Sequence, residues 1–142
     1  MFKTILLPVD LGEESSWTKA LPAALLHARG DGGGLHVLTV VPNFGEGIVG
    51  AYFPPDFAGQ ALANAKSELE AFCAARVPKE VSVAAMVRSG RIYDEIIDAA
   101  KEIDADLIVM ASHRPALRDY LIGPNAERVM RHATCSVLVV RA

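Results

Sequence analysis

The segment 107–115 joins four apolar residues to one small residue, two polar residues and a cation, Arg114. Eight residues, 115–122, then separate Arg114 from Gly123, where a new helical pattern begins. A buried strand that ends in this way directs backbone N–H groups and a guanidinium towards one place, and a helix that starts at a glycine nearby adds further N–H groups. Both arrangements attract phosphate, so the pattern predicts a nucleotide-binding site.

The composition indicates one globular domain, residues 1–142. Hydrophobic residues make up 51% of the chain and charged residues 22%, which excludes a disordered chain. The net charge of −3 argues against a general nucleic-acid binder, which should carry a basic face. Cys73 and Cys135 form no metal-type or redox motif. No signal-peptide pattern and no apolar run of about 18 residues is evident, so we expect a cytoplasmic protein without a membrane span.

Strand-like and helix-like segments alternate along the chain, which predicts an α/β fold. Most of the strand-like segments are continuous apolar runs, as burial on both faces of a parallel sheet requires. We therefore expect a five-stranded, mostly parallel sheet with helices on both faces, a Rossmann-like nucleotide-binding fold. The expected strands are 4–9, 35–41, 81–87, 106–110 and 136–140, and the expected helices are about 15–29, about 56–75, one after Gly90 and 123–132.

Two helical segments carry further detail. Pro22 falls inside the first helical pattern, so the helix is either kinked there or starts late. Asp56 is a candidate cap for the second helix. In the helix after Gly90 the apolar stripe consists of Ile92, Ile96, Ile97 and Ala100.

Asp10 follows the first strand and is the acidic candidate for the site. In open α/β sheets a ligand lies beyond the carboxyl ends of the strands, where the strand order reverses. If the first and fourth strands are neighbours there, Asp10 meets residues 111–114 and can accept hydrogen bonds from ribose hydroxyls or a base amine. The alternative is that Asp10 caps the turn into the first helix, because aspartate favours turns.

Four segments together resemble the universal stress protein family over the full length of the chain. They are residues 5–10, 106–113, 123–133 and 135–141. The resemblance implies a five-stranded parallel sheet and a tendency to dimerise. It also implies binding of an adenine nucleotide, ATP or ADP or AMP, with or without magnesium, since many members bind ATP.

The phosphate motif departs from that of the ATP-binding members, which carry glycine, two residues, glycine, nine residues, and then glycine with serine or threonine. In this chain Ala111 and Arg114 occupy the positions of the first and second glycine. Eight residues instead of nine separate Arg114 from Gly123, and Pro124 replaces the serine or threonine. The chain is similar in this respect to a bacterial branch of small members, the F- and G-type proteins. Arg114 offers five donors and a fixed charge to phosphate. Pro124 lacks an N–H, and Asn125 is a candidate replacement donor.

The resemblance and the strand ends together give the predicted binding residues. Adenine is expected near Pro8, Val9 and Val40, with Asp10 beside the base or ribose. His113 either contacts phosphate or packs locally at the strand end. The full predicted set is Pro8, Val9, Asp10, Val40, Met110, Ala111, His113, Arg114, Gly123, Pro124 and Asn125.

Three function hypotheses follow. The first is a nucleotide-binding regulatory protein of the stress response. The second is a slow ATP hydrolase or self-phosphorylating protein; no Walker motif is present and no general base is evident, so efficient turnover is not expected. The third is a nucleotide-free dimeric interaction protein, which the changes at Arg114 and Pro124 favour.

Two segments predict interactions beyond the nucleotide. The last strand, 136–140, is apolar and lies at the chain end, so we expect it at a sheet edge where a second copy can pair with it. Oligomers larger than a dimer are an alternative. Leu138 and Val140 should share one face of this strand. The connection 42–55 is long for a compact domain and is either a ligand lid or a fixed surface loop.

Overall fold

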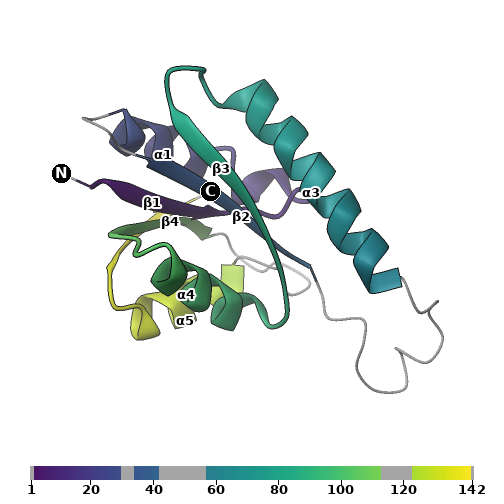
Figure 1. The fold of residues 1–142 in the computed structure, drawn as a ribbon. Helices are drawn as coiled ribbons and strands as arrows, with labels where there is room; N and C mark the ends of the chain where they lie inside the picture. The colour runs from purple at the N-terminus through teal and green to yellow at the C-terminus, as the bar shows by residue number, and fades with distance from the viewer. Residues whose placement is uncertain (1, 30–33, 42–56, 113–122, 142) are drawn as a thin grey trace.

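The computed structural model describes residues 2–29, 34–41, 57–112 and 123–141. In this part of the chain five parallel strands form one sheet in the order β3-β2-β1-β4-β5 (Figure 1). The predicted α/β architecture is therefore confirmed. The strands are β1 (Thr4–Pro8), β2 (Gly34–Val41), β3 (Ser82–Ser89), β4 (Leu107–Ser112) and β5 (Ser136–Arg141).

Helices cover both faces of the sheet, with α1 and α3 on one side and α4 and α5 on the other (Figure 1). The helices are the short 3-10 helix η1 (Glu14–Ser16), α1 (Ala20–Ala28), α3 (Phe57–Arg76), α4 (Ile92–Glu102) and α5 (Gly123–His132). The first helix starts late, and this was one of the two outcomes predicted from Pro22. Pro22 lies in the first turn of α1, where a missing N–H costs little. Asp56, the expected cap of α3, lies outside the described residues.

Two apolar cores lie on opposite faces of the sheet, because side chains alternate along each strand. Ile5 and Leu7 of β1 pack towards α1 and α3, whereas Leu6 between them packs towards α4 and α5. All three side chains are fully buried. The two cysteines follow the same division, since Cys73 belongs to the first core and Cys135 packs against the second.

The buried stripe of α4 differs from the predicted one. Ile96 and Ala100 are buried as expected, but Ala99 is also fully buried while Ile97 is only half-buried. The buried face of α4 therefore includes the small Ala99, and Ile97 lies at its margin.

β1 and β4 are neighbours, with Ile5 opposite Leu107 and Leu6 opposite Ile108. The chain passes from β1 outward to β2 on one side, and β4 lies on the other side. This is the reversal of strand order at which ligands bind in open α/β sheets. The carboxyl ends of β1 and β4 therefore meet, so the condition on which the placement of Asp10 depended is fulfilled.

Candidate functional site

The end of β1 is fixed to β2 by hydrogen bonds beyond the last residue of the strand. The backbone N–H of Val9 donates to the carbonyl of Leu38 at 2.8 Å. The buried hydroxyl of Thr39 donates to the carbonyl of Val9 at 3.0 Å. Pro8 has no N–H, so these bonds on the next residue hold the strand end in place.

Ser16 fastens the loop that follows β1. Its fully buried hydroxyl accepts a hydrogen bond from the N–H of Asp10 at 2.9 Å and donates to the carbonyl of Asp10 at 3.0 Å. Oδ1 of Asp10 accepts the N–H of Gly12 at 3.0 Å, so the turn-capping alternative is correct for one carboxylate oxygen. The other oxygen, Oδ2, has no hydrogen bond within the described part of the chain. It is the oxygen that can serve a ligand.

The environment of Asp10 opposes its negative charge. Burial raises the pKa of its carboxyl group, the Gly12 N–H lowers it, and the nearby Glu13 carboxylate raises it further, so the net direction is upward. A half-buried carboxylate with a raised pKa gains from a ligand that donates hydrogen bonds to it. Ribose hydroxyls and an amino group are donors of this kind.

A shallow hollow lies at the carboxyl ends of β1 and β2, against α4. It encloses only about 10 Å³, close to the space of one water molecule, so it is not a deep pocket in the free protein. Two of its residues, Ile92 and Ile96 of α4, were predicted as core residues and not as part of the site. The lining consists of Pro8, Val9, Asp10, Leu38, Val40, Ile92 and Ile96.

An ion-pair network fixes the position of α4 over this hollow. Nε of Arg88, near the end of β3, lies 2.9 Å from Oε1 of Glu95. The same guanidinium also pairs with Glu102, the last residue of α4. Hydrogen bonding to Glu95 raises the pKa of Arg88, which keeps the guanidinium charged. Gly90, between β3 and α4, donates its N–H to the carbonyl of Val41 at 3.2 Å.

The residues predicted for the phosphate region fall into three groups: two lie in β4, two lie outside the described residues, and three lie at the start of α5. Met110 and Ala111 are fully buried on opposite faces of β4, and neither is among the residues that line the hollow. His113 and Arg114 lie outside the described residues. Gly123 and Pro124 form the start of α5, as predicted, and the half-buried Asn125 follows in its first turn.

Comparison with known proteins assigns the chain to a family. The chain matches the Universal stress protein family over residues 1–141. The chain belongs to the universal stress protein family. It is 34% identical to Universal stress protein G of Salmonella typhimurium over 145 aligned positions, which cover 99% of this chain and 100% of that protein. It is 32% identical to a universal stress protein of Thermus aquaticus, with 99% and 100% coverage.

Solved structures share the fold. One is a hypothetical protein whose biochemical function was assigned from its structure, with a TM-score of 0.81, 24% identity and coverage of 100% and 97% of the two chains. A universal stress protein in complex with cAMP has a TM-score of 0.57 and 21% identity, with 99% and 97% coverage. A family protein from Arabidopsis thaliana with AMP bound has a TM-score of 0.64 and 17% identity, with 98% and 91% coverage.

Helix length and hydropathy bear on membrane association. Among the described helices of this universal stress protein, none is both long and apolar enough to cross a membrane.

Proposed function

We propose that this universal stress protein is an adenine-nucleotide-binding regulatory protein that acts in the stress response in the cytoplasm. The single observation that carries the proposal is the hollow at the point where the strand order reverses, with apolar walls and one carboxylate at its rim. Family members with cAMP and AMP bound support the choice of an adenine nucleotide. ATP, ADP and AMP are the candidate ligands, with magnesium as a candidate companion of the phosphates.

The base would lie on the apolar surface of the hollow. Pro8 and Val9 contribute from β1 and Val40 from β2. Val40 is half-buried and is the next-to-last residue of its strand, and in this proposal its backbone groups would pair with the edge of a purine. Oδ2 of Asp10 would accept a hydrogen bond from ribose or from a base amine.

The phosphates would lie between the end of β4 and the start of α5. Gly123 opens α5, and the unpaired N–H groups of a helix start attract anions. Pro124 supplies no N–H, and Asn125 is the proposed replacement donor to phosphate. Arg114 follows β4 by two residues and would add a permanent charge, with His113 beside it.

We also propose that two copies associate through β5, the edge strand, without nucleic acid as a partner. Slow hydrolysis or self-phosphorylation and a nucleotide-free interaction protein are the alternative outcomes of the binding test.

Isothermal titration of nucleotide-free protein with ATP, AMP and adenosine tests the proposal. Asp10→Ala should weaken binding of all three by about 1–3 kcal/mol, because a buried hydrogen bond is lost. Arg114→Ala should weaken ATP binding more than adenosine binding. Arg131→Ala is the matched control, because Arg131 lies in the last turn of α5 and pairs with Glu127 on the surface.

Absence of ATP and AMP binding at millimolar ligand would overturn the nucleotide proposal and favour the interaction protein. Equal losses for ATP and adenosine in Arg114→Ala would show that this arginine does not contact phosphate. Product analysis after a single turnover with ATP and magnesium separates a binder from a slow hydrolase.

A further inference from the structure

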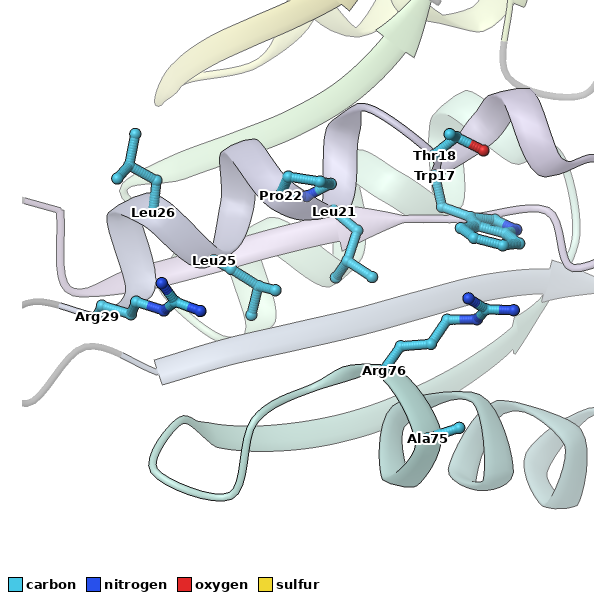
Figure 2. Close-up of a pocket in the computed structure, with 9 residues that line it drawn as sticks. All are labelled: Trp17, Thr18, Leu21, Pro22, Leu25, Leu26, Arg29, Ala75 and Arg76. Carbon is cyan, nitrogen blue, oxygen red and sulfur yellow. The ribbon is translucent and has the colours of Figure 1, made fainter.

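A groove runs between α1 and the C-terminal end of α3, on the face of the sheet opposite α4 (Figure 2). Its volume of about 640 Å³ falls within the range of roughly 300–1,000 Å³ that is typical of small-molecule sites. The nucleotide proposal uses none of its residues. The lining consists of Trp17, Thr18, Leu21, Pro22, Leu25, Leu26, Arg29, Ala75 and Arg76.

The floor and wall of the groove are apolar. Leu21 is almost fully buried and Leu25 is half-buried, and both point from α1 into the space above α3 (Figure 2). Leu26, on the outer rim, is 72% exposed. Together with Leu21 and Leu25, Leu26 gives the groove an apolar lining that an aliphatic chain can contact.

Two guanidinium groups flank this apolar surface. Arg76 is stacked over the ring of Trp17, with its guanidinium carbon 4.2 Å from the ring centroid, and also faces the ring of Phe72 at 5.5 Å. Arg29 lies on the other side of Leu25 (Figure 2). Within the described residues neither arginine forms an ion pair with a carboxylate.

This placement of charge is specific for an anion. The whole chain has a net charge of −3, yet the charged side chains that line the groove are both cations. Stacking on Trp17 holds the Arg76 guanidinium in a fixed orientation, which lowers the entropy lost when it binds an anionic group.

We propose that the groove binds a soluble single-chain amphiphile with an anionic head, a carboxylate or a phosphate. The head meets the guanidinium of Arg76, and the aliphatic chain lies along Leu21 and Leu25 towards Leu26. Arg29 adds positive potential at the far end of the groove. The volume suits one such chain, whereas the interior of a bilayer cannot enter a groove between two helices.

The chain carries its own probe, because Trp17 is its single tryptophan and lines the groove. Titration with sodium dodecanoate below its micelle concentration should change the tryptophan fluorescence with saturation. Dodecyl phosphate in a parallel titration distinguishes the two head groups. Butyrate, which lacks the tail, and dodecyltrimethylammonium, which reverses the head charge, should bind at least tenfold more weakly.

Calorimetric titrations of variants assign the binding to the groove. Arg76→Gln should weaken dodecanoate binding about tenfold or more, because a charge-assisted contact is lost. Leu26→Glu should also weaken it, and this exposed position tolerates a polar side chain, so the test does not depend on the stability of one variant. Arg131→Gln on the opposite face should bind as the original protein does.

Equal binding of dodecanoate and the alkylammonium, or unchanged dodecanoate binding in Arg76→Gln and Leu26→Glu, would overturn the proposal. Arginine-dependent binding to dioleoylphosphatidylglycerol vesicles with none to monomeric dodecanoate would also overturn it, in favour of a membrane surface. Nucleotide titrations are expected to be unaffected by either variant, so the two proposals fail separately.

Discussion

At the scale of single residues, Gly90 has a backbone conformation that residues with a side chain rarely adopt. Its φ is +145°, and a Cβ atom placed there would lie 2.7 Å from Oε2 of Glu95. Gly90→Ala should therefore lower the free energy of unfolding by about 1–3 kcal/mol. In this variant alanine would have to adopt a strained backbone conformation, and its Cβ would displace Glu95 from its ion pair with Arg88. Denaturation in urea measures this change.

Gly59→Ala is the matched control for Gly90. Gly59 lies within α3, and an added Cβ would meet nothing within 4 Å. This substitution should raise the free energy of unfolding by up to about 1 kcal/mol, since alanine is the better helix former. A similar change of stability in both variants would contradict the strain assigned to Gly90.

Asp10 should give stability a specific pH dependence. Its pKa is raised above the ordinary value of 3.8, so the folded protein binds this proton more tightly than the unfolded chain does. The resulting stabilisation is present below the unfolded pKa and is lost as pH rises through the folded pKa. Asp10→Asn, which keeps the Oδ1 acceptor for Gly12, should therefore gain stability relative to the original protein between pH 3 and pH 7.

Thermal unfolding across that pH range measures the effect of Asp10→Asn. Glu13→Gln is the companion variant, because the Glu13 carboxylate contributes to the raised pKa of Asp10. In this variant, NMR titration should show a lower pKa for Asp10 than in the original protein. A carboxyl group that titrates at or below 3.8 in the original protein would show the assigned direction to be wrong.

At the scale of elements, the loop after β1 depends on one buried hydroxyl. Ser16→Ala removes both hydrogen bonds to the backbone of Asp10 and leaves a buried N–H unpaired. We expect a loss of about 1–3 kcal/mol in the free energy of unfolding and weaker nucleotide binding, because the loop no longer presents Asp10 in one position.

Thr18→Ala serves as the control for Ser16→Ala, since its hydroxyl also bonds a backbone carbonyl, that of Glu14 at 2.7 Å, but is exposed. Its effect on stability should stay within about 0.5 kcal/mol. If both variants had the same small effect in chemical denaturation, Ser16 would not be the residue that organises the loop.

The elements also show how far sequence reasoning reaches. The continuous apolar runs predicted five parallel strands, and α5 begins and ends where the glycine start and the periodicity placed it. Burial follows the prediction in β1, β2 and β4, whereas the edge strands β3 and β5 contain no fully buried residue. The apolar spacing alone placed the start of the first helix at about residue 15, and only Pro22 indicated the later start, because the spacing before Pro22 is shared by the 3-10 helix η1 and the turn that follows it. Periodicity alone does not distinguish these from an α-helix.

The site was predictable only in part, for a physical reason. Asp10 and Val40 both line the hollow. Asp10 was predicted because it follows a strand whose end shares one edge with the other parallel strands, and Val40 because the family resemblance assigns that position at the end of the second strand. Ile92 reaches the hollow from a helix more than 50 residues further along the chain than Val40. That contact depends on how α4 packs against the sheet, which no local sequence pattern records.

At the scale of the whole molecule, the sheet has two different edges. β3 lies at one edge and β5 at the other, so the predicted edge position of β5 is confirmed. Leu138 and Val140 pack against the core on the α1 side, while Val137 and Val139 pack against the core on the α4 and α5 side, as expected from the alternation. All four side chains remain half-buried in the single chain. A second copy could complete their burial on both faces.

We predict that two copies pair through β5 about a two-fold axis, because antiparallel pairing would satisfy the free backbone groups of this edge. Sedimentation equilibrium at micromolar protein should give the mass of a dimer. Val139→Lys should shift the mass towards the monomer, because it places a charge in the interface while leaving the backbone donor intact. Val83 lies in β3 at the opposite edge and is 38% exposed, so the Val83→Lys variant should remain a dimer. A monomeric original protein would refute the interface, and equal dissociation of both variants would show that β5 has no special part in it.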